Sequence, residues 1–261
     1  MLRHIVISCC LLSTLCLCGC EAQQQPETAK KELLIYCGTA MAAAVREVSD
    51  IFETQENCTV KIIKEGSGVL LHSIQINQKG DLYLPGCESY LNQASAEGLI
   101  IEDVIIGYQH PTIMVAKNNP LNIDTNLTNF FNTTFRTAIG DPESGSIGRQ
   151  TRILLQKSGI YHKVIEHAQL ILPDSRALYD AIVANKVDLT INWLSEGQHQ
   201  HSLFVDTFSL PDNNVHRVTL KMALLRYSQH IDLAKRYLSL SCSPTAEVIF
   251  TRYGFGKTSH E

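Results

Sequence analysis

The sequence predicts an α/β protein of two lobes, each a mainly parallel sheet flanked by helices, with a cleft between them. Short apolar runs, typical of buried strands, alternate with segments whose apolar residues recur at helical spacing. This alternation occurs twice, over two stretches of similar length. The chain of 261 residues is long enough for two domains of ordinary size. It therefore needs no metal or disulfide to build its cores.

The first stretch has the order of a βαβαβ unit. Apolar residues at three- and four-residue steps predict a helix from Met41, and a second, short helix ends near Gly80. The turn Pro85-Gly86 stops the third strand. The expected strands are residues 33–36 (LLIY), 59–63 (TVKII) and 81–84 (DLYL). In such units ligands bind at the carboxyl ends of the parallel strands.

The second stretch repeats the pattern, and the chain then returns to the first. Strands are expected at 111–117, 137–140, 168–172 and 189–193, with helices at 147–157 and around 178–182. A strand at 218–225 and helices from about 229 and from Ser243-Pro244 follow. We therefore expect residues 33–110 with 218–261 to form lobe 1, and residues 111–217 to form lobe 2. The chain would cross between the lobes near 107–111 and 211–217, which allows them to hinge.

The N-terminal residues predict export and a lipid anchor. One fixed positive charge at Arg3 precedes an apolar run at 5–18, which is too short for a membrane span and typical of a secretory signal. The run ends in Leu17-Cys18-Gly19-Cys20, which resembles the bacterial lipobox. This resemblance implies a signal peptide at 1–19 and lipidation of Cys20, on the periplasmic side of the cell envelope. The polar residues 20–32 are expected to form a tether.

Composition limits the function further. With 22 Lys and Arg against 26 Asp and Glu, and no long basic run, the chain is not suited to binding nucleic acid. Four cysteines follow the predicted lipidation site: Cys37, Cys58, Cys87 and Cys242. Four cysteines allow three disulfide pairings, and the sequence does not choose among them.

Four short loops, two from each expected lobe, carry the candidate site. Each joins a strand to a helix, so it offers the unpaired N–H groups of a helix N-terminus, and most add a hydroxyl. The loops are 37–40 (CGTA), 66–68 (GSG), 144–148 (SGSIG) and 174–175 (DS). Any one of them is also typical of an ordinary helix cap. Their occurrence at equivalent places in both lobes favours a shared anion or polar-ligand site.

The chain from about 33 to 257 resembles the molybdate-binding proteins of ABC importers, in the type II periplasmic binding family. The segments that carry the resemblance are 34–45 (LIYCGTAMAAAV), 65–74 (EGSGVLLHSI), 80–84 (GDLYL), 139–148 (IGDPESGSIG) and 246–255 (AEVIFTRYGF). The resemblance implies that a tetrahedral oxyanion, molybdate or tungstate, binds between the lobes without metal, cofactor or catalytic residue. It also implies a monomeric protein that delivers the oxyanion to a permease in the membrane.

The resemblance also implies the ligand-binding residues. Ser67 falls on a ligand serine of the family, and Ile147 and Ser175 fall on positions that contribute backbone N–H groups, with Ser146 beside them. Two positions depart from the pattern, and they put the identity of the anion in doubt. Ala40 replaces a serine, whose hydroxyl Thr39 can supply, and Trp193 replaces a tyrosine. Sulfate or phosphate is the alternative ligand.

Other charged residues near these loops offer alternatives. A site that offers only hydrogen-bond donors suits a fully ionised oxyanion, whereas a protonated phosphate also needs an acceptor. Asp141, Glu143 and Asp174 are candidates for that acceptor. Such residues more often cap helices or hold loops. Arg149 and Arg176 are more typical of surface or inter-lobe positions. The sequence 199–201 (HQH) with Glu196 is a weak metal candidate. An envelope sensor or enzyme on the same scaffold is the alternative function, although no nucleophile motif occurs.

Overall fold

The computed structural model describes residues 30–198, 202–210 and 217–256. The predicted signal peptide, the lipidation site Cys20, the 199–201 histidines and most of the expected second crossing lie outside these residues. Within them, no helix combines the length and the apolar character that a bilayer crossing needs.

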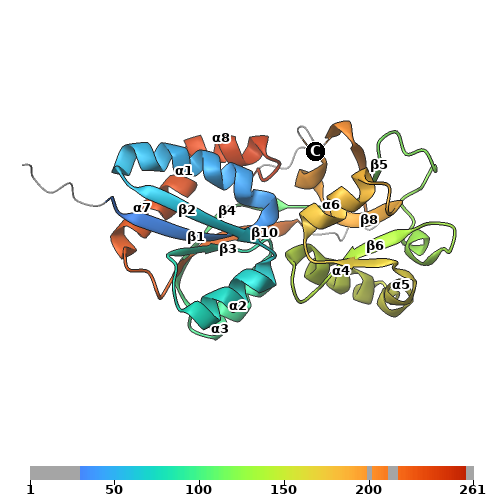
Figure 1. The fold of residues 1–261 in the computed structure, drawn as a ribbon, viewed down its shortest axis with the longest axis horizontal. Coiled ribbons are helices and arrows are strands. Elements are labelled where there is room, and N and C mark those ends of the chain that lie inside the picture. The colour runs from blue at the N-terminus through green and yellow to red at the C-terminus, as the bar shows by residue number, and fades with distance from the viewer. Residues whose placement is uncertain (1–29, 199–201, 211–216, 257–261) are drawn as a thin grey trace, which may run out of the picture.

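The described chain folds into two five-stranded sheets with helices around each (Figure 1). The first sheet and its helices comprise β1 (Glu32–Gly38), η1 (Thr39–Met41), α1 (Ala42–Glu56), β2 (Thr59–Glu65), α2 (Ser67–Asn77), β3 (Leu82–Leu84), α3 (Glu88–Ala96), β4 (Ile100–Gln109), β10 (Val218–Leu225), α7 (Ile231–Ser241) and α8 (Pro244–Arg252). The second comprise β5 (Pro111–Ala116), η2 (Leu127–Phe131), β6 (Thr137–Gly140), α4 (Ser146–Lys157), α5 (Tyr161–His167), β7 (Leu170–Leu172), α6 (Ser175–Val183), β8 (Leu189–Trp193), η3 (Leu194–Gly197) and β9 (Val205–Ser209). We call these two bodies lobe 1 and lobe 2.

Both sheets follow one plan, which confirms the predicted fold class. The strand order is β2-β1-β3-β10-β4 in lobe 1 and β7-β6-β8-β5-β9 in lobe 2. In each sheet the first three strands are mutually parallel, and the fourth, β10 or β5, runs against its two neighbours. The reversed strand is the one that enters directly after the chain has crossed from the other lobe. The crossing thus explains why each sheet is mainly, but not wholly, parallel.

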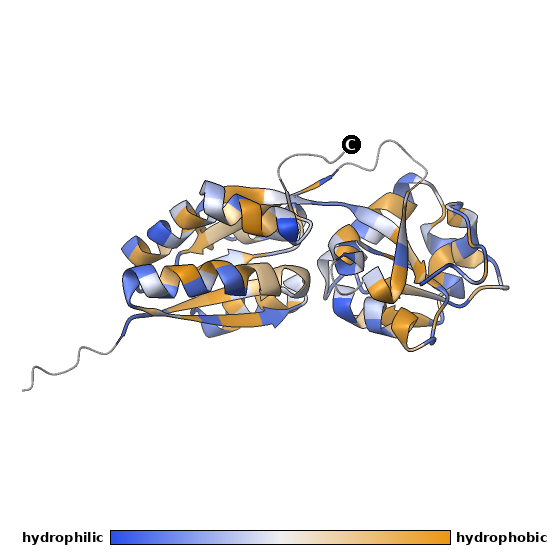
Figure 2. Cartoon of the chain, turned by 90° about the horizontal axis from the view of Figure 1, so that it is seen from above, coloured by the Kyte–Doolittle hydropathy of each residue, from blue (hydrophilic) through white to orange (hydrophobic). Residues whose placement is uncertain are grey.

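Each lobe has a core of its own. In lobe 1, α1, α7 and α8 cover one face of the sheet and α2 and α3 the other, with a separate apolar cluster under each layer (Figure 1). In lobe 2 a single cluster joins α4, α5 and α6 to the sheet. Figure 2 shows the same separation by hydropathy, because apolar residues gather on the strands and the inner helix faces. Each lobe can therefore move without exposing its core.

One crossing between the lobes is described, and the C-terminal segment packs on it. β4 ends at Gln109 and β5 begins at Pro111, so a nearly continuous strand passes from one sheet to the other. The Tyr108 N–H donates to the Phe255 carbonyl oxygen at 3.2 Å. Gly107 permits this approach, because a Cβ there would lie 1.9 Å from the same oxygen.

Besides the short 3-10 helices, four elements of the described chain are absent from the sequence prediction: α3, β4, α5 and β9. Strand β4 lies at a sheet edge with most of its first half exposed, so it lacks the buried alternation that predicts a strand. Helix α5 and strand β9 are short, with seven and five residues. Their patterns are too brief to be distinguished from loops, and tertiary packing decides them.

No disulfide joins the four cysteines of the described chain. None of the three pairings left open by the sequence is formed. Cys37, Cys58 and Cys87 are buried, and burial raises the pKa of each thiol. These cysteines therefore act as small apolar residues of the lobe 1 core.

Candidate functional site

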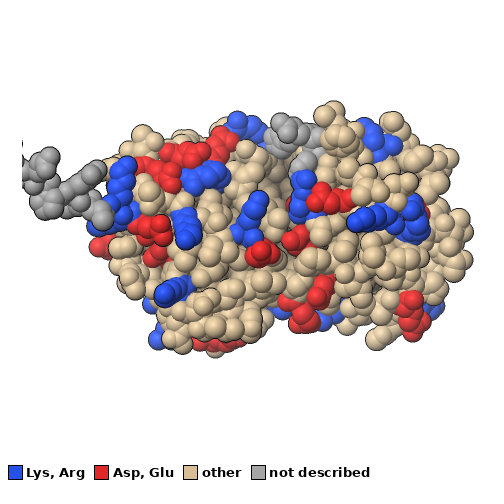
Figure 3. Space-filling model, in the orientation of Figure 1, with Lys and Arg blue, Asp and Glu red and all other residues tan. Residues whose placement is uncertain are grey.

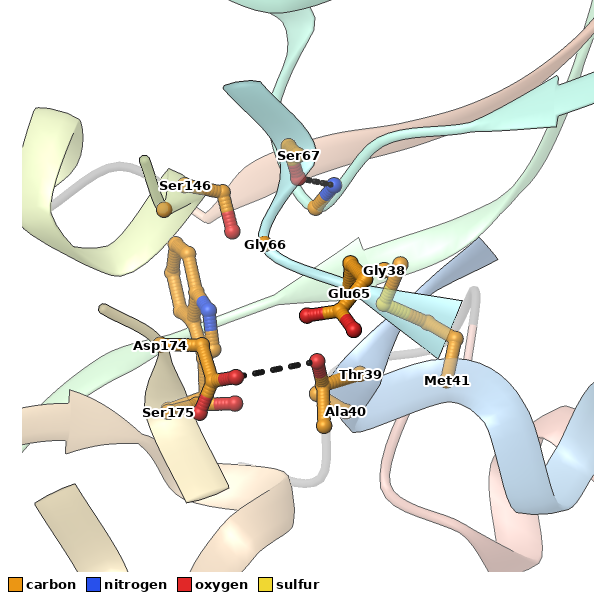
Figure 4. A pocket seen from close by; sticks show the side chains of 13 residues that line it. Gly38, Thr39, Ala40, Met41, Glu65, Gly66, Ser67, Ser146, Asp174 and Ser175 are labelled. Atoms are coloured by element: carbon orange, nitrogen blue, oxygen red, sulfur yellow. Dashed lines mark hydrogen bonds between the residues drawn. The ribbon is translucent and has the colours of Figure 1, made fainter. Parts of the chain in front are cut away.

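A small cavity lies between the lobes, at the carboxyl ends of the parallel strands (Figure 4). Its empty volume is about 230 Å³, including the part that opens to solvent. Because this volume includes space open to solvent, the enclosed part is smaller, and the cavity suits a ligand of a few atoms. Its lining residues are Gly38, Thr39, Ala40, Met41, Glu65, Gly66, Ser67, Gly86, Gly145, Ser146, Asp174, Ser175 and Trp193.

All six parallel strands deliver residues to this cavity. In lobe 1, β1 leads to Thr39, β2 to Ser67 and β3 to Gly86. In lobe 2, β6 leads to the loop before Ser146, β7 to Asp174, and β8 ends at Trp193. Ser67, Ser146 and Ser175 are the first residues of α2, α4 and α6. The backbone N–H groups of a first helical turn have no partner within their own helix, so both lobes offer donors here.

Ser67 is held in place by its own lobe. Its Oγ accepts a hydrogen bond from the Gly86 N–H at 3.0 Å, and its carbonyl oxygen accepts one from the Tyr83 hydroxyl at 2.8 Å. A hydroxyl that accepts keeps its hydrogen for donation. Ser67 is therefore oriented as a donor, and its side chain points toward the cavity in Figure 4.

Ser146 faces Ser67 from the other lobe (Figure 4). It is only 8% exposed, yet its hydroxyl has no hydrogen-bond partner among the described residues. Ser146 Oγ is not one of the fully enclosed polar atoms that lack a partner in the described chain, so it opens onto the cavity. Ser146 is thus a second hydroxyl available to a ligand.

Ser175 has a different role. Its Oγ donates to Glu196 Oε1 at 2.9 Å, and its carbonyl oxygen accepts from Asn192 Nδ2 at 3.0 Å. Burial raises the pKa of the Glu196 carboxyl, although the Ser175 hydrogen bond acts in the opposite direction. Because its hydroxyl is used inside lobe 2, Ser175 has only its backbone N–H to offer, as the sequence resemblance implied.

Two carboxylates also line the cavity, and only one was considered from the sequence. Asp174 caps α6, since its Oδ1 accepts from the Ala177 N–H at 2.9 Å, and its Oδ2 accepts from Thr39 Oγ1 at 3.4 Å (Figure 4). Glu65, the last residue of β2, lies at the exposed rim and points toward the same space. The Thr39 hydroxyl is therefore directed at Asp174, and does not simply replace the donor that is missing at Ala40.

The remaining predicted site residues divide between the cavity and the cores. Ala40 and Trp193 line the cavity, and Trp193 is 1% exposed. Ile147 lies in the lobe 2 core, and its side chain is not part of the lining. Met41, Glu65 and Gly86 were missed, although Glu65 and Gly86 each lie two residues after a predicted strand of the βαβ unit. Their location just after a parallel strand was the signal in the sequence that could have identified them as ligand-site residues.

Direct contacts hold the two lobes together beside the cavity. The Gly68 N–H donates to the Ser144 carbonyl oxygen at 2.8 Å. The Tyr90 hydroxyl shares its one hydrogen between the carbonyl oxygens of Pro142 and Glu143, at 2.9 and 3.0 Å. The Arg149 guanidinium lies 3.3 Å from the centre of the Tyr90 ring. Arg149 is thus an inter-lobe residue.

Charged groups elsewhere near the loops do not enter the cavity. Asp141 accepts from the Glu143 N–H at 2.9 Å and holds the turn before α4, and Arg176 pairs with Asp180 at 3.0 Å. No Lys or Arg is among the lining residues. In the part of the chain that the structure describes, no group of three or more His, Cys, Asp or Glu side chains could hold a metal ion. The face in Figure 3 carries both signs of charge, interspersed over the two lobes.

Several solved structures share this fold at low sequence identity. The periplasmic molybdate-binding protein of Azotobacter vinelandii aligns with a TM-score of 0.72 and 14% identity, covering 87% of this chain and all of that one. The sulfate-binding protein SubI of Mycobacterium tuberculosis H37Rv aligns with a TM-score of 0.77 and 16% identity, covering 88% of each chain. A periplasmic thiamin-binding protein aligns with a TM-score of 0.75 and 17% identity, over 89% of this chain and 85% of that one. Such identities establish the fold alone.

A family match covers most of the chain. No curated protein sequence matches it. Residues 33–256, however, match the family described as bacterial extracellular solute-binding protein. The match spans both lobes and every residue that lines the cavity. The chain belongs to the family of bacterial extracellular solute-binding proteins.

Proposed function

We propose that this chain is the binding protein of an ABC importer, and that it captures a small tetrahedral oxyanion in the cavity between its lobes. One observation carries the proposal: the first residues of α2, α4 and α6 meet at one small cavity, with two hydroxyls directed into it. Helix N-termini carry partial positive charge and unpaired N–H groups, which together favour an anion. Donors from both lobes also give the ligand a means of holding the lobes closed.

The resemblance and the structural neighbours support this class of ligand. The sequence likeness to molybdate-binding proteins supports molybdate or tungstate, and one neighbour in fold is a molybdate-binding protein. Another is a sulfate-binding protein, which supports the wider class that includes sulfate and phosphate. Among the positions that depart from the molybdate pattern, Ala40 and Trp193 both line the cavity. The departures thus affect the residues that would contact the ligand.

The proposed partner is the membrane permease of the same ABC importer. A lipid on Cys20, with residues 20–32 as tether, would keep the binding protein close to that permease. Substitution Cys20→Ala is expected to abolish processing and lipid labelling. Unchanged labelling would remove the anchor from the proposal and leave the binding function intact.

Thermal unfolding with a panel of oxyanions tests the binding function. A ligand that binds only the folded state, present at 1,000 times its Kd, adds about 4 kcal/mol of stability. For a chain of this size that corresponds to a rise in Tm of about 8 to 16 °C. The panel is molybdate, tungstate, sulfate and phosphate, and at least one member is expected to give such a rise. If none shifts Tm at millimolar concentration, the oxyanion proposal is wrong.

A further inference from the structure

The cavity has two chemically different sides. One side offers donors: the hydroxyls of Ser67 and Ser146 and the first N–H groups of their helices. The other side offers acceptors, because Asp174 and Glu65 both direct carboxylates into the space (Figure 4). An ionised carboxylate can only accept hydrogen bonds. A ligand that fits both sides must accept from the serines and donate to a carboxylate.

Asp174 retains capacity for such a bond. A carboxylate has about four acceptor sites. The Ala177 N–H takes one at 2.9 Å, and the Thr39 hydroxyl takes another at 3.4 Å, which is long for a bond between oxygens. Asp174 is half-buried, and its cap on α6 fixes the carboxylate at the cavity. The remaining acceptor sites are therefore held in position before a ligand arrives.

Ser146 independently indicates a ligand on the donor side. Its side chain is more than nine-tenths buried and aimed into the cavity, without a hydrogen-bond partner among the described residues. It stands across the cavity from Asp174 and Thr39 in Figure 4. The Ser146 hydroxyl can thus donate a hydrogen bond to a ligand, and the Asp174 carboxylate on the opposite side can accept one from it.

The charges of the cavity disfavour a fully ionised dianion. Each helix N-terminus contributes roughly half a positive charge, so α2, α4 and α6, whose first residues line the cavity, together supply roughly one and a half. Glu65 and Asp174 supply two negative charges, and no Lys or Arg lines the space. A sulfate or molybdate dianion would then lie against a carboxylate with nothing between them. A proton on the ligand converts that contact into a charge-assisted hydrogen bond.

We infer that the ligand is an oxyanion that carries its own proton, namely a hydrogen phosphate group, and that Asp174 accepts that proton's hydrogen bond. The inference rests on the proposed function and narrows it. It differs from the molybdate that the resemblance implies, because Asp174 and Glu65 add acceptors to a site otherwise built of donors. The group can belong to free phosphate or to a phosphate monoester.

Isothermal titration of the purified protein near neutral pH tests the inference. Sulfate is the sharpest comparison, because it is tetrahedral like phosphate but carries no proton near neutral pH. Phosphate is expected to bind at least 100-fold more tightly than sulfate, molybdate or tungstate, because a ligand that leaves a buried polar group of the site without a hydrogen bond binds with much lower affinity. Glycerol 3-phosphate distinguishes a monoester from free phosphate as the source of the group. This comparison needs no variant.

Asp174→Asn adds a second test on the same titration. Asparagine also caps helices, and its amide can donate to an oxyanion. Phosphate affinity is expected to fall about 10- to 150-fold, as for loss of a hydrogen bond to a charged group, while sulfate affinity rises. Asp141→Asn is the matched control, because Asp141 caps a turn in the same lobe without lining the cavity. It is expected to leave both affinities unchanged.

The outcomes separate the inference from the proposed function. If sulfate, molybdate or tungstate binds the wild-type protein as tightly as phosphate does, the inference is overturned and oxyanion capture stands. The inference is also overturned, and oxyanion capture again stands, if Asp174→Asn leaves the ratio of phosphate to sulfate affinity unchanged. If no oxyanion binds at all, the proposed function fails as well.

Discussion

Two serines at the cavity differ in the bonds they already make. The Ser67 hydroxyl accepts from the Gly86 N–H, whereas the Ser146 hydroxyl has no partner among the residues described. Removing Ser67 Oγ therefore leaves a buried N–H unsatisfied and also takes a donor from the ligand. Removal of Ser146 Oγ affects the ligand alone. The two serines thus separate folding stability from ligand affinity.

We expect Ser146→Ala to weaken phosphate binding about 10- to 150-fold, because it removes one hydrogen bond to a charged group. The Tm of the ligand-free protein should stay within about 1 °C of wild type, since no bond within the protein is lost. Ser67→Ala should weaken binding by a similar factor and also lower the ligand-free Tm. Calorimetric titration and thermal unfolding measure the two effects.

Ser73→Ala is the control for both serine variants. Ser73 lies on α2, and its hydroxyl bonds only to its own helix, to the Val69 carbonyl oxygen at 2.9 Å. It should leave the affinity unchanged. Equal losses of ligand-free stability in the Ser67 and Ser146 variants would contradict the different roles assigned to them. Wild-type affinity in both would place the ligand elsewhere.

At the scale of elements, helix α2 forms both the ligand site and the boundary with lobe 2. Gly68, its second residue, donates to the Ser144 carbonyl oxygen across the cleft. A Cβ at Gly68 would lie 2.0 Å from the Glu143 carbonyl oxygen, which is backbone of the opposite lobe. Glycine is therefore required at this position for lobe closure, while the helix itself does not need it.

Gly68→Ala is expected to act on closure and on folding with opposite signs. Alanine is the better helix former by about 1 kcal/mol, so the ligand-free protein should unfold at an equal or slightly higher temperature. Phosphate affinity should fall at least about 10-fold, because the lobes can no longer approach as closely. Thermal unfolding and titration of one preparation give both results. A variant that binds normally would show that the cleft closes differently.

At the scale of the whole molecule, two lobes with separate cores share a described crossing between β4 and β5. Several contacts across the cleft are hydrogen bonds, and the Tyr90 hydroxyl takes part in two of them. Desolvation by burial raises the pKa of this hydroxyl, so it remains a protonated donor at physiological pH. Such contacts can open and close without unfolding either lobe.

Tyr90→Phe should shift the ligand-free protein toward a more open form. It removes the inter-lobe hydrogen bonds of the Tyr90 hydroxyl and keeps the ring beneath Arg149. We expect a larger radius of gyration by small-angle X-ray scattering without ligand, and an unchanged value at saturating phosphate. Affinity should fall about 2- to 12-fold, as for one net hydrogen bond. Tyr253→Phe, whose hydroxyl bonds to Glu47 within lobe 1, should change neither quantity.

The fold class and most helices and strands could be predicted from local sequence patterns. Strands β6, β8 and β10 have the expected bounds, because each is mostly apolar and lies between two other strands of its sheet. The helix starts that reach the cavity were also expected, since glycine, serine and aspartate mark them locally. Periodicity and caps are properties of neighbouring residues, so a sequence displays them directly.

Which residues of the two lobes contact each other at the cavity could not be predicted from the sequence. Strand β4 and helix α3 carry weak local patterns, and packing within lobe 1 fixes them. Thr39 and Asp174 are 135 residues apart in sequence and meet only when the lobes face each other. The same holds for Tyr90 with Glu143, and for Glu65 at the cavity rim. A contact between lobes depends on how two separately folded cores are oriented, and no local pattern encodes that orientation.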